Sequence, residues 1–277
     1  GVQLALFADT ILASFLSVGA LSALYYADRL NQLPIGVIGI AAGTVLLPEM
    51  ARRIAAEDEQ GALDAQNRAI ELTLALAMPF TVGFLVVPEL IMRALFGRGA
   101  FTAADAAAAG ATLRAYALGL IPFVLIRSLV ATFFARGDTA TPVKASLTAA
   151  ALNVVLKIAL VTTTGLAQVG LALATTVGAW VNVGLVTWFA VRAGLFSADT
   201  RLKRAIGKLA LASALLAAAL WIAEPLTGAI AYRWPALRDE IALVALAGLG
   251  AIIYVPVLVA VFGRNWRALL GLGRPAA

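Results

Sequence analysis

Two charged residues inside an apolar stretch, Asp28 and Arg29, carry the clearest chemistry in this sequence. They lie in the string Tyr25-Tyr26-Ala27-Asp28-Arg29. Charges at membrane depth are costly and usually serve a function. A guanidinium binds phosphate through two parallel hydrogen bonds, and a neighbouring carboxylate can position it when no ligand is bound. We therefore predict that Arg29 binds an anion, positioned by Asp28. The alternative is an interfacial pair, with Arg29 reaching toward the headgroups and both tyrosines anchoring the surface.

A second possible site combines Asp9, Asn153 and Lys157. Asn153 and Lys157 are four residues apart and would share one face of a helix. Asp9 lies in another apolar stretch, where a carboxylate needs a partner. We expect Asp9 and Lys157 to pair, either as a fixed ion pair that sets packing or as a cation- or proton-linked switch; otherwise Lys157 reaches to the membrane surface. Arg127 is either a membrane anchor or a residue that lines a cavity.

The composition identifies the elements that must carry these residues. The chain has 277 residues, of which 62% are apolar and 13% charged, and its mean hydropathy is +0.95. Two stretches, 166–191 and 241–263, contain no Asp, Glu, Lys or Arg, and each exceeds the roughly 20 residues that cross a bilayer. Small residues are abundant, and a β-barrel would show short alternating strands instead. We predict an all-α polytopic membrane protein.

The same criteria predict about eight transmembrane helices. The stretch 20–52 is too long for one straight crossing, and Pro34 offers a place to bend beside a cavity. The polar run 52–69 is expected to form a surface helix or linker, or else a docking surface. The predicted spans lie near 2–18, 20–52, 70–95, 106–135, 142–164, 166–191, 205–224 and 241–263.

Two helix boundaries have local signals. Thr102, followed by Asp105 three residues later, is typical of a capping box that opens a helix. Gly137 is expected to end the span 106–135, and Pro142 to begin the next.

The distribution of Lys and Arg predicts the orientation. When the spans alternate with the amino end in the cytoplasm, most of the 21 basic residues fall inside. Both termini of this segment are then cytoplasmic. The exceptions are Arg93, Arg98, Arg114, Arg233 and Arg238, which fall outside, and Arg29, Arg127 and Lys157, which fall at membrane depth.

Several function classes are excluded or made less probable by composition. The net charge is +6, but the cations are spread over loop ends, so topology explains them better than nucleic-acid binding does. The chain has no His and no Cys, and it shows no convincing nucleophile or carboxylate pair, so we expect neither an enzyme nor a cofactor. No confident metal site is predicted. The chain begins at Gly1, with no Met and no signal peptide, and we expect it to be a fragment.

Four motifs together give the chain a resemblance to a known family. It resembles the MurJ (MviN) lipid II flippases of the multidrug/oligosaccharidyl-lipid/polysaccharide exporter superfamily. The motifs occupy residues 25–30, 34–48, 96–102, and Asp138 with 141–144.

The resemblance implies only the second lobe and tail helices of a two-lobe transporter. Residues 1–195 would form a six-helix lobe, and 196–277 two tail helices and a cytoplasmic end, with the first lobe absent. The function implied is movement of the undecaprenyl-pyrophosphate-linked precursor across the bacterial inner membrane by alternating access, with Arg29 on the pyrophosphate.

The implied partners are membrane lipid, this precursor and the amino-terminal lobe. Some superfamily members bind sodium through a carboxylate and polar groups that Asp9 and Asn153 match, but the ammonium of Lys157 would repel the ion. Two alternatives stay open: an exporter of another polyprenyl-linked oligosaccharide or of drugs, and a membrane scaffold that does not transport.

Overall fold

The computed structural model describes residues 16, 19–231 and 234–262, and this part of the chain contains helices and no strand. The all-α prediction is therefore confirmed. The predicted span 2–18, with Asp9, lies outside the described residues. The helices are α2 (Ala20–Ala55), α3 (Glu59–Val86), α4 (Pro88–Phe96), α5 (Ala103–Phe134), α6 (Ala140–Thr163), α7 (Ala167–Arg192), α8 (Thr200–Ala231), the short 3₁₀ helix η1 (Pro235–Leu237) and α9 (Arg238–Phe262).

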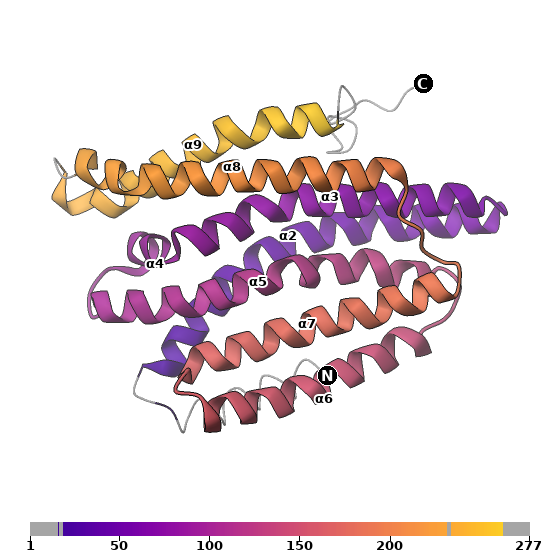
Figure 1. Cartoon of the computed structure of the whole chain (residues 1–277), viewed down its shortest axis with the longest axis horizontal. Coiled ribbons are helices and arrows are strands. Elements are labelled where there is room, and N and C mark those ends of the chain that lie inside the picture. Colours follow the sequence, from indigo (N-terminus) through magenta and orange to yellow (C-terminus); the bar gives the residue numbers. More distant parts are fainter. Residues whose placement is uncertain (1–15, 17–18, 232–233, 263–277) are drawn as a thin grey trace.

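The long helices lie side by side, and their connections gather at two opposite ends of the molecule (Figure 1). The connections α2–α3, α5–α6 and α7–α8 lie at one end, which we call the first end. The connections α4–α5, α6–α7 and α8–α9 lie at the other, the second end. Six helices, α3 and α5 to α9, are long and apolar enough to cross a membrane. The chain is thus a membrane protein, and these six helices run between the two ends in alternating directions.

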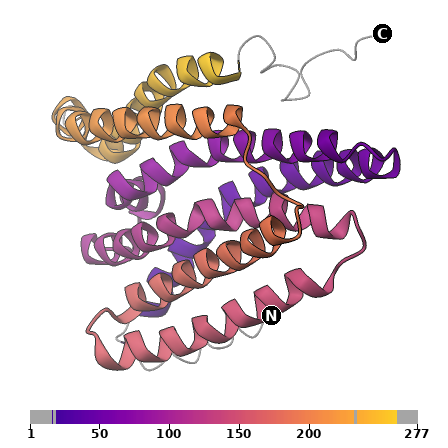
Figure 2. The same ribbon diagram turned by 45° about the vertical axis from the view of Figure 1, so that its right-hand side comes forward.

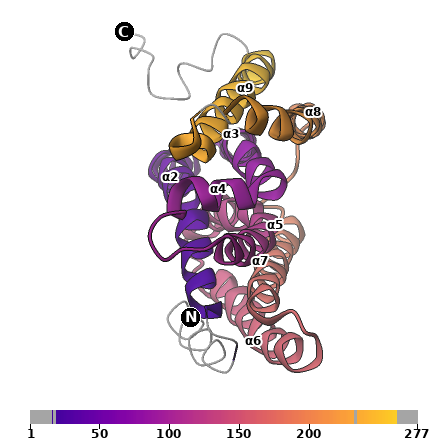
Figure 3. The same cartoon turned by 90° about the vertical axis from the view of Figure 1, so that its left-hand side faces the viewer.

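Helix α5 lies at the centre of the packing. It contacts α2, α3, α4 and α7, while α6 packs on the far side of α7. Its residues Leu113, Leu120 and Val124 are fully buried. The pair α8 and α9 lies beyond α3 and α4, at the opposite edge from α6 (Figures 2 and 3). The two predicted tail helices therefore form an outer layer on α3 and α4.

Local sequence explains several helix ends. The Thr102 hydroxyl and the Asp105 carboxylate cap each other's backbone amides, which confirms the capping box. Gly137 has φ 75°, a left-handed conformation that glycine adopts without strain, and it follows the end of α5. The Asp138 carboxylate accepts a hydrogen bond from the Thr141 amide at 3.0 Å, which holds the pKa of Asp138 below its usual range.

The predicted span 70–95 is wrong in one respect, because it is two helices. Helix α3 ends at Val86 and α4 starts at Pro88. The proline ring disfavours helical backbone at the preceding residue, and Val87 has φ −122° and ψ 40°. Arg114 of α5 donates to the exposed carbonyl of Leu85 at 3.0 Å, which partly replaces the hydrogen bonds lost at the break.

The polar run 52–69 does not form a separate surface helix. Helix α2 continues to Ala55, residues 56–58 turn, and α3 begins at Glu59. The Asp58 carboxylate accepts from the Gly61 amide at 2.8 Å and so caps α3. Both helices extend farther than their apolar sections because caps and ion pairs stabilise polar turns as well. Pro34 does not interrupt α2, although the helix changes direction along its length (Figure 1).

Candidate functional site

Arg29 lies on a face of α2 that no other described helix covers. Tyr25, Leu33, Val37 and Ile40 are exposed along the same face, with Val37 73% accessible. Their spacing of three or four residues keeps them on one side of the helix. We call this the open face of α2. It places Arg29 among apolar side chains in the described part of the chain.

The guanidinium of Arg29 is positioned by an aromatic ring. Its Cζ lies 4.9 Å from the centroid of the Tyr25 ring, within the range of a cation–π contact. The Asp28 carboxylate accepts a hydrogen bond from the Gln32 amide, one turn farther along α2. Arg29 stands nine residues after Ala20, about 14 Å along the axis of α2. The residue is thus held in place with its charged end accessible.

An aromatic cluster packs against the amino-terminal part of α2, at the second end of the molecule. The Tyr26 ring lies 4.7 Å from the Phe96 ring and 5.4 Å from the Phe101 ring, between centroids. The motifs 25–30 and 96–102, far apart in sequence, therefore meet in space. Tyr25 and Tyr26 have different roles, because Tyr26 packs in this cluster while Tyr25 contacts Arg29.

The side chain of Arg127, on α5, lies against α2 at Gly39. A Cβ atom at Gly39 would lie 2.5 Å from Arg127 Nε and 2.6 Å from its Cδ. In this conformation the Arg127 side chain occupies the space that a Cβ atom at position 39 would take, and the arginine itself stays exposed. This contact connects Arg127 to the helix that carries Arg29.

Lys157 is fully buried in α6, with Asn153 half-buried one turn earlier. The buried residues of this helix are few and form one stripe: Pro142, Ala145, Ala149 and Lys157. A Cβ atom at Gly178 of α7 would lie 3.0 Å from Asn153 Cβ, so α7 packs closely against Asn153. Asp9, the predicted partner of Lys157, lies outside the described residues, and the pairing stays a prediction.

The structure reveals a charge cluster that sequence reasoning missed. Glu71 of α3 is 0% exposed, and its Oε2 contacts Arg68 and also Arg201 Nε of α8, the latter at 3.3 Å. Arg68 also binds Asp199, at the start of α8. We call these four residues the α3–α8 clamp. The spacing of Arg68 and Glu71 was a visible signal, but the partners some 130 residues later were not.

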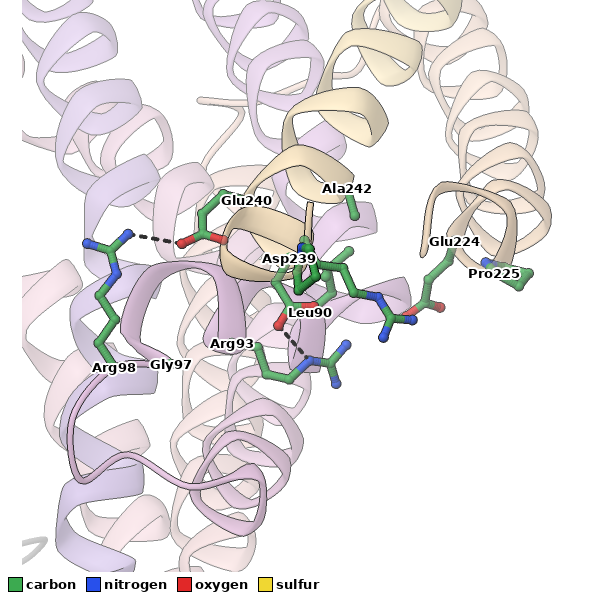
Figure 4. Close-up of a pocket in the computed structure, with 11 residues that line it drawn as sticks. Leu90, Arg93, Gly97, Arg98, Glu224, Pro225, Asp239, Glu240 and Ala242 are labelled. Atoms are coloured by element: carbon green, nitrogen blue, oxygen red, sulfur yellow. Dashed lines mark hydrogen bonds and ion pairs between the residues drawn. The ribbon is translucent and has the colours of Figure 1, made fainter. Parts of the chain in front are cut away.

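A cleft of about 680 Å³ lies at the second end, between α4, α8 and α9 (Figure 4). Two ion pairs cross from α4 and the following loop to α9: Arg93 Nε lies 3.4 Å from Asp239 Oδ2, and Arg98 Nη2 lies 3.0 Å from Glu240 Oε1. Arg29 is not among its lining residues. The cleft therefore marks an electrostatic contact between the tail and the rest of the protein, separate from the open face of α2.

In the part of the chain that the structure describes, no group of three or more Asp or Glu side chains is arranged to hold a metal ion. The arrangement on α2 supports non-covalent anion binding, because a guanidinium lies on an exposed helix face.

The fold is similar to that of membrane transporters with solved structures. The chain superimposes on an outward-facing multidrug resistance MATE family transporter of the MOP superfamily with a TM-score of 0.61, at 21% identity, over 98% of this chain and 63% of that one. It superimposes on a lipid II flippase MurJ in an inward closed conformation with a TM-score of 0.76, at 22% identity, over 97% of this chain and 52% of that one. These likenesses show the fold.

Sequence comparison identifies the family. The model of the lipid II flippase MurJ family matches residues 2–232. A probable lipid II flippase MurJ of Rhizobium meliloti (strain 1021) is 40% identical over 268 residues, covering 95% of this chain and 49% of the relative. The chain belongs to the MurJ family of lipid II flippases, and it spans about half the length of the curated relatives that it matches.

Proposed function

We propose that this chain is the carboxyl-terminal half of a lipid II flippase. Together with an amino-terminal lobe, it would move the undecaprenyl-pyrophosphate-linked peptidoglycan precursor from the cytoplasmic to the outer leaflet by alternating access. Family membership supports this substrate. The observation that carries the proposal is Arg29, an arginine that contacts Tyr25 on the open, otherwise apolar face of α2. Such a group suits a pyrophosphate that must cross hydrocarbon.

The open face of α2 would line the cavity that the two lobes share. A guanidinium there can form two charge-assisted hydrogen bonds to phosphate oxygens, and Asp28 would hold Arg29 in position when the site is empty. The process breaks no covalent bond in the substrate, so we propose a transporter with no enzymatic step and no cofactor.

The orientation is also part of the proposal. The first end carries Arg52, Arg53 and Arg136, among other cations, and the second end carries fewer. Positive loops favour the cytoplasm, so the first end would face the cytoplasm of a bacterial inner membrane. Both termini of the segment would then be cytoplasmic.

We propose that Asp9, Asn153 and Lys157 form an ion-pair or coupling site. The complete burial of Lys157 supports it, because a buried ammonium needs a carboxylate or other acceptors. The full-length protein with Asp9→Asn and Lys157→Met together should lose the dependence of transport on sodium or pH. Unchanged transport and unchanged dependence on both would leave the pair a packing element only.

The test of function is a leaflet assay for the labelled precursor. Membranes with the full-length protein should expose labelled lipid II on the outer side, while this chain alone should expose none. Fluorescent drug efflux and transport of a polyprenyl-linked oligosaccharide other than lipid II serve as parallel measurements, because the MATE likeness favours an exporter as the second candidate. Efflux or transport of the other substrate without lipid II exposure would support that candidate, and no transport of any substrate would support a scaffold.

A further inference from the structure

The prolines inside long helices of the lobe include Pro79 in α3 and Pro122 in α5, besides Pro34 and Pro48 in α2. Proline has no backbone N–H, so the carbonyl four residues earlier loses its hydrogen bond within the helix. For Pro79 and Pro122, the affected carbonyls belong to Ala75 and Leu118. In hydrocarbon an unpaired carbonyl is costly, because no water can replace the missing donor.

Each of these two carbonyls receives a hydrogen bond from the side chain of another helix. The Tyr254 hydroxyl of α9 donates to the Ala75 carbonyl at 2.9 Å. The Trp180 indole N–H of α7 donates to the Leu118 carbonyl, also at 2.9 Å. In both cases the donor reaches the one carbonyl that the proline leaves without its helical partner.

The environment makes the Tyr254 contact the more consequential one. Ala75 is 0% and Tyr254 3% exposed, whereas Trp180 and Leu118 are both nearly half exposed. Tyr254 also belongs to the few core residues of α9, with Ala242 and Leu246, at intervals of four and eight residues. The buried stripe of this tail helix thus delivers a hydroxyl to the interrupted turn of α3.

We propose that Tyr254 is a positioning residue that replaces, from the tail, the backbone hydrogen bond that Pro79 removes from α3. The tail helices then determine the shape of a lobe helix directly, in addition to covering its surface. Trp180 performs the same role for α5 from α7, at a more exposed position. The inference does not depend on the substrate, so it can hold even if the proposed function fails.

A double-mutant cycle tests the inference in the full-length protein, purified in detergent and unfolded with a denaturant. Tyr254→Phe removes only the hydroxyl and should lower the folded-to-unfolded ratio on the order of threefold, as is typical for an interhelical hydrogen bond in a membrane protein. Pro79→Ala restores the N–H at position 79. In that background Tyr254→Phe should have almost no effect, because the Ala75 carbonyl is no longer left bare.

Two further measurements separate this role from simple packing. Tyr254→Phe combined with Pro122→Ala is the matched control. Its change in unfolding free energy should equal the sum of the changes in the two single variants, because the two sites are not in contact. Amide hydrogen exchange in residues 80–83 should accelerate in Tyr254→Phe and return toward the starting rate when Pro79→Ala is added. The proposal would be overturned if Tyr254→Phe lowered the unfolding free energy equally in the Pro79 and Pro79→Ala backgrounds. It would also be overturned if Tyr254→Phe had no effect with Pro79 present.

Discussion

The open face of α2 and the α3–α8 clamp differ in how their charged residues are placed: the first carries an exposed charge and the second a buried, paired one. Arg29 contacts an aromatic ring and keeps its charged end accessible. Glu71 is fully buried and lies against two arginines from two helices. A charge that a protein leaves accessible at membrane depth is available for a ligand. A charge that it buries and pairs is committed to the packing of the protein itself.

The largest effect on stability should come from breaking the clamp. Glu71→Ala removes the buried carboxylate that Arg68 and Arg201 share, and loss of a hydrogen bond to a charged group costs about 1.5 to 3 kcal/mol. The measurement is the free energy of unfolding in detergent. Glu89→Ala is the control, because its pair with Arg93 is half exposed and such pairs contribute about 1 kcal/mol or less. Equal losses in the two variants would mean that burial of Glu71 has no special role.

Arg29→Ala should reduce transport and leave stability nearly unchanged. Transport of labelled lipid II should fall about 10- to 100-fold, since hydrogen bonds to charged groups contribute about 1.5 to 3 kcal/mol each, while the unfolding free energy stays nearly unchanged. Arg29→Lys should recover only part of the activity, because an ammonium cannot bind phosphate through two parallel hydrogen bonds. Arg98→Ala, at an arginine whose side chain is 75% exposed, should transport normally. Normal transport by Arg29→Ala would exclude Arg29 as a substrate contact.

The contrast between the two regions also explains what the sequence could predict. Arg29 was recognisable because an arginine interrupts an apolar stretch beside aromatic residues. The capping box at Thr102 and the helix end at Gly137 were equally local signals, and both are confirmed. These features depend on residues within a few positions of one another.

Features that depend on distant residues were not predictable in the same way. Glu71 seemed to lie at the end of a span, because apolar residues alone set the predicted start at 70, whereas caps extend α3 back to Glu59. Its partner Arg201 is brought close only by the packing of α8 on α3. The break at Val87 was missed for a different reason: the apolar pattern continues through Pro88, and the local effect of that proline on the preceding residue was not taken into account.

A smaller effect should come from the glycine that admits Arg127 to α2. Gly39→Ala places a methyl group 2.5 Å from Arg127 Nε, so the flexible arginine must move, and stability should change by about 1 kcal/mol or less. Gly36→Ala, one turn away with no atom within 4 Å, is the matched control. If Arg127 contributes to the open face, only Gly39→Ala should reduce transport. Equal transport in both variants would place Arg127 outside the substrate path.

The smallest effect should appear at the edge of the clamp, as a dependence on pH. Partial burial raises the pKa of Asp199, but hydrogen bonds from the Leu202 amide and Arg68 outweigh it, so the pKa of this carboxyl lies below its usual range. A lowered pKa in the folded state adds stability above the unfolded value, near 3.9, and this stability is lost as pH falls through the folded pKa.

Asp199→Asn keeps a side-chain acceptor for the α8 cap but loses the charge, so it should lower the unfolding free energy by less than about 1 kcal/mol at pH 7. Its unfolding free energy should fall less steeply than that of the unmodified protein below about pH 4. Parallel curves for the two proteins would show that the ion pair between Arg68 and Asp199 adds no stability. The clamp would then consist of the ion pairs to Glu71 alone.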